Sequence, residues 1–162
     1  MKAAIYIGKP ELEKDLRLAT LIDALRRGGC DLYSVYGAED VAEDTDMLLS
    51  VGGDGTFLRT ARWVGNKQIP ILGINTGHLG YLADITVDEM TAAIDDLKNG
   101  LYKVEARSLI EVTSTRKEAI VDWNYALNEV AVVKQDTSSM ISVETMVDDV
   151  ELATYKGDGL IV

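Results

Sequence analysis

The stretch Gly52-Gly53-Asp54-Gly55 stands between an apolar segment and a helical pattern, and this junction limits the folds open to the chain. The apolar residues 47–51 are typical of a buried strand, and the spacing of apolar residues predicts a helix from near Thr56 to Gly65. Similar segments alternate on both sides of this pair. They are expected strands at 3–7, 32–36 and 69–74 and expected helices at 11–27 and 86–99. Strands joined by helical crossovers favour a parallel sheet.

The pattern changes at about residue 100, where helical spacing gives way to apolar stretches separated by short polar breaks. Such stretches are typical of antiparallel strands. The expected strands lie at 101–115, 123–133, 141–147 and 151–155. We therefore expect an α/β chain, with a Rossmann-like parallel sheet and flanking helices at 1–100, followed at 101–162 by the start of a β-rich, sandwich-like domain.

The glycine loop suggests a phosphate site. Glycines leave no side chain between the backbone and a ligand, and the start of a helix presents N–H groups to an anion. The carboxylate of Asp54 would repel a phosphate unless it accepts a proton from an attacking hydroxyl or holds Mg²⁺. The alternative is a plain structural turn. Neither G-x-x-x-x-G-K-[ST] nor G-x-G-x-x-G occurs, because Leu58 stands where the third glycine of the latter would be.

A second glycine-rich stretch, 73–85, follows the next expected strand. Two such loops at the carboxyl edge of one sheet would form a crevice. Asn75, Thr76 and His78 supply donors and acceptors, while Tyr81 and its leucine neighbours could form an apolar wall. His78 is the only histidine, and a lone histidine is often structural. Its place in a glycine-rich loop favours contact with a ligand.

Composition and charge exclude several classes of protein. A net charge of −11 argues against a nucleic-acid partner. The acidic run at 39–46 is expected to be a solvated helix or loop rather than a metal site. Cys30 is the only cysteine, so no internal disulfide is expected and a reducing cytoplasm is favoured. No apolar run approaches the roughly 18 to 20 residues of a membrane helix, so no membrane partner is expected.

Four motifs, "GGDGTFLRTA", "GINTGHLGYL", "ALNEVAVV" and "YKGDGLIV", occur in this order and spacing, and together they resemble the NAD kinases along nearly the whole chain. NAD kinases transfer the γ-phosphoryl group of ATP, or in some members of polyphosphate, to the 2′-hydroxyl of the adenosine ribose of NAD. The resemblance implies that Asp54 acts on that hydroxyl, and that Gly52, Gly53 and Gly55 shape the turn beside it. Phosphoryl transfer further implies Mg²⁺ or another divalent cation.

The resemblance also assigns residues in the second half of the chain. Asn128 and Glu129 match a motif that contacts the adenine and ribose region of NAD. Neighbouring side chains of a straight strand face opposite ways, so the two could meet one ligand only at a strand end or a bulge. Asp158 matches an aspartate on the nicotinamide side, with a simple turn as the alternative. Arg59 is either a phosphate contact or a solvated surface residue. The cleft is further expected to be lined by Asn75, His78 and Tyr81.

The NAD kinases continue beyond the "GDGLIV" with which this sequence ends. We therefore expect an N-terminal fragment of somewhat over half a family member, with the activity, and a homo-oligomeric state such as a dimer or tetramer, belonging to the complete protein. A lipid kinase of the diacylglycerol or sphingosine type shares the Gly-Gly-Asp-Gly logic but does not need "NTGHLGYL" or Asn128-Glu129. A domain that binds NAD without reacting is the other alternative, and Asp54 argues against it.

Overall fold

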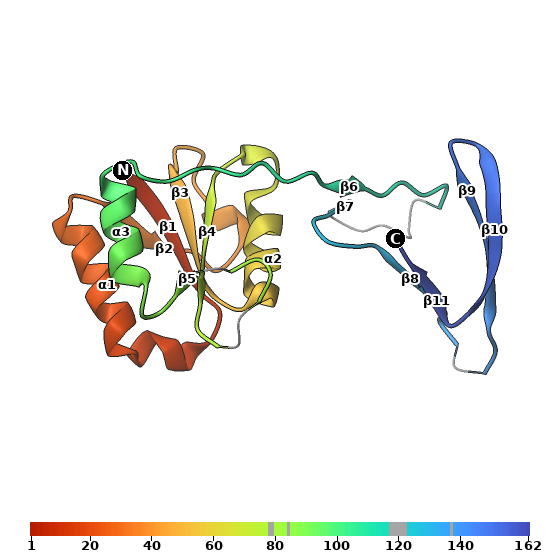
Figure 1. Cartoon of the computed structure of the whole chain (residues 1–162), viewed down its shortest axis with the longest axis horizontal. Helices are drawn as coiled ribbons and strands as arrows, with labels where there is room; N and C mark the ends of the chain where they lie inside the picture. Colours follow the sequence, from red (N-terminus) through yellow and green to blue (C-terminus); the bar gives the residue numbers. More distant parts are fainter. Residues whose placement is uncertain (78–79, 84, 117–122, 137) are drawn as a thin grey trace. The chain divides into compact units, whose positions relative to one another are not determined.

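The structure is a computed structural model that describes residues 1–77, 80–83, 85–116, 123–136 and 138–162. Contacts divide the chain into two compact units, Met1–Glu105 and Ala106–Val162. The first unit is a five-stranded parallel sheet in the order β2-β1-β3-β4-β5 (Figure 1). Its strands are β1 Lys2–Ile7, β2 Asp31–Ser34, β3 Met47–Gly52, β4 Ile71–Asn75 and β5 Ile85–Thr86. The expected parallel α/β sheet is confirmed.

Helices cover both faces of this sheet, as Figure 1 shows. The helices α1 (Leu16–Arg27) and α3 (Met90–Lys98) pack on one face, and α2 (Asp54–Val64) packs on the other. All six residues of β3 are buried, because both faces of this central strand are covered. None of the helices in the described ranges has the length and the apolar character needed to cross a bilayer.

The helix predicted over 11–27 is in fact two elements, so that prediction was wrong at its N-terminal part. A 3-10 helix, η1, covers Pro10–Lys14, and α1 begins only at Leu16. Asp15 separates the two, and its carboxylate accepts a hydrogen bond of 2.8 Å from the backbone N–H of Arg17. A short carboxylate side chain favours this capping position over a helix interior.

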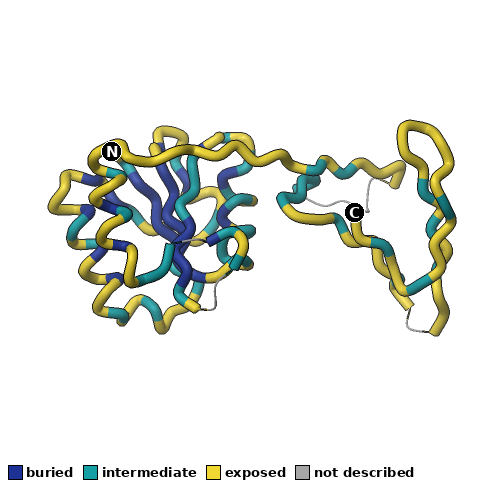
Figure 2. The backbone as a smooth tube through the Cα atoms, in the orientation of Figure 1, coloured by how far each residue is buried: buried dark blue, intermediate teal, exposed yellow. Residues whose placement is uncertain are grey.

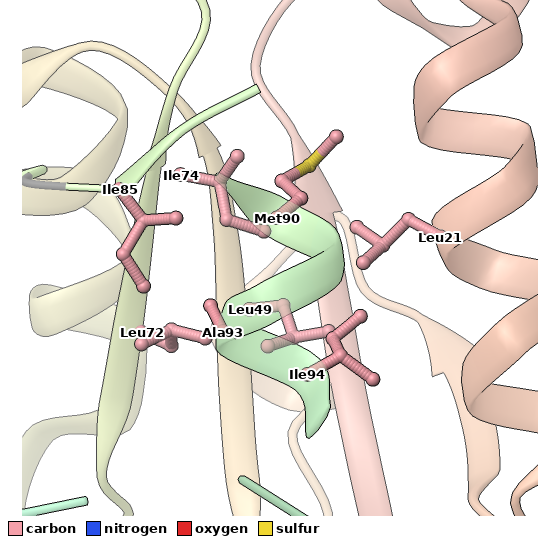
Figure 3. A pocket seen from close by; sticks show the side chains of 8 residues that line it. All are labelled: Leu21, Leu49, Leu72, Ile74, Ile85, Met90, Ala93 and Ile94. Atoms are coloured by element: carbon pink, nitrogen blue, oxygen red, sulfur yellow. The ribbon is translucent and has the colours of Figure 1, made fainter. Parts of the chain in front are cut away.

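A small apolar cavity of about 10 Å³ lies beneath α3 (Figure 3). The side chains that converge on it come from two helices and three strands of the sheet. They are Leu21, Leu49, Leu72, Ile74, Ile85, Met90, Ala93 and Ile94. A space of this size with an apolar lining holds neither an ordered water nor an organic ligand. It is a gap in core packing and not a binding site.

The acidic run at 39–46 is tied to the first unit by its partners. The 3-10 helix η2 (Ala38–Asp40) opens it. The ammonium of Lys2 pairs with Asp44 at 2.5 Å, and the backbone N–H of Lys2 donates to Asp46 over 2.7 Å. Within the described ranges, no three potential metal-ligating side chains of His, Cys, Asp or Glu come together. The run is therefore attached to the amino end of β1, just before β3 begins.

The second unit consists of antiparallel strand pairs, as its β-rich pattern predicted. The pairs are β6 (Ile110–Glu111) with β7 (Tyr125–Ala126), β8 (Ala131–Val133) with β11 (Gly159–Ile161), and β9 (Ile141–Val147) with β10 (Val150–Gly157). The strand predicted over 101–115 is wrong, because only Ile110 and Glu111 have a partner strand in the part of the chain that the structure describes. Most of the described residues of this unit are exposed (Figure 2).

Candidate functional site

The direction in which the chain adds strands to the sheet reverses after β2, so the sheet has a topological switch point between β1 and β3. From β1 the chain adds β2 on one side and β3 on the other. Open α/β sheets bind ligands outside the carboxyl ends of the strands at such a switch point. Gly8 follows β1 there, and its N–H donates to the carbonyl oxygen of Val51 over 2.8 Å. The glycine loop that begins at Gly52 therefore lies where this fold favours a ligand.

The helix α2 begins inside the glycine loop, two residues earlier than the spacing predicted. Gly53 is the N-cap, and its carbonyl accepts the N–H of Thr56 over 2.9 Å. A Cβ atom added to Gly53 or Gly55 would meet no described heavy atom within 4 Å. The backbone at the start of α2 is thus open to approach, and a helix start with this access can bind a phosphate.

The carboxylate of Asp54 bridges the two glycine-rich loops. It accepts three backbone hydrogen bonds from the second loop: from Tyr81 N to Oδ2 at 2.9 Å, from Leu82 N to Oδ1 at 3.1 Å, and from Ala83 N to Oδ1 at 3.4 Å. The N–H groups of Tyr81 and Leu82 chiefly, with that of Ala83, hold the pKa of Asp54 below its ordinary value. Asp54 is therefore ionised at neutral pH and fixed in direction.

The second loop is itself fastened to the end of β4. Asn75 is only 3% exposed, and its amide donates to the carbonyl of Ala83 over 3.3 Å and accepts from the N–H of Gly77 over 2.9 Å. Tyr81, in contrast, is 93% exposed. The sequence predicted both residues to line a cleft, and the structure places Asn75 within the loop scaffold and Tyr81 at its surface. His78, the third residue predicted there, lies outside the described residues.

Arg59 lies on α2 and is turned toward the end of β1. Its guanidinium donates to the hydroxyl of Tyr6 over 2.7 Å. The ring of Tyr6 in turn packs edge-on against Trp63, with the ring centroids 4.5 Å apart. This contact fixes the direction of the guanidinium, although Arg59 as a whole residue is exposed. Its assignment as a phosphate contact stays a prediction.

The remaining predicted residues lie in the second unit, at strand ends. Asn128 and Glu129 follow β7 and precede β8, which meets the condition that both can face one ligand only outside a straight strand. Asp158 forms the connection between β10 and β11. Its carboxylate pairs with the ammonium of Lys134 at 2.6 Å, and its carbonyl accepts the N–H of Lys134 over 2.9 Å.

Sequence reasoning missed three groups that bind the carboxylates of Asp54 and Asp158. Lys134 carries no motif, and only the strand pairing of β8 with β11 brings it to Asp158. The N–H groups of Leu82 and Ala83 are backbone atoms, which no residue type reveals. The proximity of the two loops was predictable from the parallel sheet, but their direct contact through a side chain of the first loop was not.

The family model and the curated relatives that match this chain all carry the same family name. Residues 23–102 match the family described as ATP-NAD kinase N-terminal domain. The NAD kinase of Bacteroides fragilis is 42% identical over 180 residues, covering 100% of this chain, and that of Porphyromonas gingivalis is 38% identical over 179 residues, covering 99%. The chain spans 62% and 61% of the lengths of these two relatives.

Solved structures agree with the sequence comparison. An NAD kinase from Archaeoglobus fulgidus, in complex with ATP, matches with a TM-score of 0.78 and 29% identity over 99% of this chain and 59% of that chain. Yeast NADH kinase, complexed with NADH, matches with a TM-score of 0.79 and 19% identity over 99% of this chain and 56% of that chain. The second likeness concerns the fold alone.

Proposed function

Because the chain belongs to the NAD kinase family, we propose that it is part of an enzyme that phosphorylates NAD. The reaction transfers the γ-phosphoryl group of ATP or polyphosphate to the 2′-hydroxyl of the adenosine ribose, giving NADP. The chain spans 62% of its relative from Bacteroides fragilis, so the activity is proposed for the complete protein. By the same resemblance we propose a cytoplasmic homo-oligomer.

The observation that supports this proposal is the fixed carboxylate of Asp54 at the edge of the sheet. A carboxylate offers about four acceptor positions, and the backbone N–H groups use three of them. The remaining position on Oδ2 can accept the ribose hydroxyl. The hydroxyl oxygen attacks the γ-phosphorus, the bond from that phosphorus to the leaving oxygen breaks, and the proton passes to Asp54. Its lowered pKa makes Asp54 a weak base that orients the hydroxyl and takes the proton late.

Other residues are proposed to bind the substrates. The open backbone at Gly53 and Gly55 would face phosphate oxygens, since a helix start favours anions. In the second unit, Asn128 and Glu129 are proposed to contact the adenosine part of NAD and Asp158 the nicotinamide side. Tyr81, with its exposed ring, would offer an apolar face to the dinucleotide.

The described residues do not build a divalent-cation site of their own. No three potential ligands come together in them, and Asp54 already accepts three hydrogen bonds. A Mg²⁺ ion would therefore arrive on the phosphates of the donor, which are its preferred ligands. No step of the proposed transfer depends on a metal held by these residues.

The proposal is tested by measuring NADP formation with a coupled assay, in this chain and in a longer form that extends to the length of its relatives. We expect turnover only in the longer form, and Asp54→Asn in that form should abolish turnover while NAD binding persists. The control is Asp23→Asn, which removes the same charge from an exposed residue of α1. Equal turnover by Asp54→Asn would refute the assigned role. Phosphorylation of diacylglycerol, or NAD binding without turnover in the longer form, would support the alternatives.

A further inference from the structure

Gly80 lies directly against the carboxylate of Asp54, across the junction of the two loops. A Cβ atom added to Gly80 would stand 2.6 Å from Cγ and 2.7 Å from Oδ2 of Asp54. Real Cβ atoms essentially never come so close to another heavy atom, so either the carboxylate or the loop must move when a side chain is present.

The three N–H groups that follow Gly80 converge on the same carboxylate. They belong to consecutive residues, Tyr81 to Ala83, which we call the amide cradle. Ala83 is 1% exposed, and its carbonyl is held by the buried amide of Asn75. The cradle is therefore anchored to β4 at one end and contacts Asp54 at the other, and Gly80 is the point at which it passes the carboxylate.

We propose that Gly80 is a positioning residue that acts through Asp54, because the absence of its side chain lets the amide cradle close on the carboxylate and leave one acceptor position for the substrate hydroxyl. This role deepens the proposed function and rests on it. A displacement of about 1 Å in a reacting group commonly costs on the order of 100-fold in rate. A side chain at position 80 would impose a displacement of this order on Asp54 or on its three donors.

The first test is a double-mutant cycle in stability, which needs no activity. Gly80→Ala should destabilise the chain to urea when Asp54 is present and should cost little in the Asp54→Ala background, because the overlapping atoms are then gone. The control is Gly77→Ala, since a Cβ atom at Gly77 meets no described atom within 4 Å. Equal costs of Gly80→Ala in both backgrounds would overturn the proposal, and the double variant keeps the test interpretable where the single variant unfolds.

The second test follows the carboxylate itself. The pKa of Asp54, measured by carbon-detected NMR titration of this chain, should rise in Gly80→Ala as the cradle opens and should stay unchanged in Gly77→Ala. In the longer form, Gly80→Ala should lower kcat by about 10-fold to 100-fold with a smaller change in KM. An unchanged pKa in a folded Gly80→Ala would sink the positioning role. A shifted pKa in a longer form that never makes NADP would instead sink the proposed function alone.

Discussion

The side chain of Thr56 fills the space in front of Gly8. A Cβ atom added to Gly8 would stand 2.8 Å from Cγ2 of Thr56 and would overlap its hydroxyl, and one added to Gly52 would stand 2.7 Å from its Cβ atom. The first turn of α2 is therefore seated on the ends of both β1 and β3. This seating fixes the start of the helix at the switch point, where its N–H groups face the edge of the sheet.

The close approach predicts that Gly8→Ala destabilises the chain by about 1–3 kcal/mol, the usual cost of overpacking. Thr56→Ala in the same chain should recover part of this loss, because it removes the two overlapping atoms but leaves Cβ at 3.2 Å. Urea unfolding of the two single variants and the double variant measures the coupling. Additive costs would show that Gly8 does not need this space.

Substitution of Gly55 by alanine is predicted to raise the stability of the chain and to lower its affinity for ATP. Gly55 is the second residue of α2 and has open space around it, so Gly55→Ala should stabilise the chain by about 0.5–1 kcal/mol. The added methyl group would stand at the proposed phosphate site, so affinity for ATP in the longer form should fall. Thr91→Ala, at the matching exposed position of α3, should change stability without changing affinity. A gain in stability with unchanged ATP affinity would argue against this phosphate site.

Asp15 is predicted to make stability depend on pH. The side chain of Arg17 first, and then its backbone N–H, lowers the pKa of Asp15 to about 2, against about 3.9 in an unfolded chain. A lowered pKa stabilises the fold above the unfolded value, and this contribution is lost as the pH falls toward about 2. The melting temperature should exceed that of Asp15→Asn near neutral pH, and the gap should shrink between about pH 4 and pH 2. When both proteins also carry Arg17→Met, this difference in melting temperature should be smaller at neutral pH. A difference that does not depend on pH would contradict the assignment.

The hairpin of β9 and β10 is predicted to become more stable when its turn carries a residue that favours positive φ angles. Val147 pairs with Val150, so Asp148 and Asp149 form a two-residue turn, and their φ angles of 50° and 63° are both positive. A type I′ turn has this geometry and favours Asn-Gly. Asp149→Gly should therefore stabilise the second unit by up to about 1 kcal/mol, read as slower amide exchange along β9. Faster exchange in this variant would contradict the strain argument.

Elements with a strong local signal were predictable from the sequence. The strand at 141–147 has the predicted bounds, and β3 with the glycine loop and α2 lies within two residues of its prediction. The segment 101–115 was not predictable, because apolar content alone does not supply the partner strand that a ladder requires. The break at Asp15 had a usable signal, since Pro10 and Asp15 are typical of helix starts.

The candidate site was predictable only in part, for the same physical reason. Placing Asp54 at the carboxyl end of a buried strand follows from the pattern around it. The partners of its carboxylate are backbone N–H groups 27 to 29 positions away. Neither these groups nor the space beside Gly80 can be recognised from the types of the residues. Pairing of Lys134 with Asp158 likewise follows from strand register, which is set in three dimensions.

Because the groups that hold Asp54 belong to the main chain, every amino acid except proline can supply them. Substitutions at 81 and 82 can therefore change the surface beside this carboxylate and still preserve the bonds that hold it, whereas Ala83 is buried. Variants with altered preference for the proposed substrate can be sought at 81 and 82, whereas proline at 81, 82 or 83 would remove a donor outright.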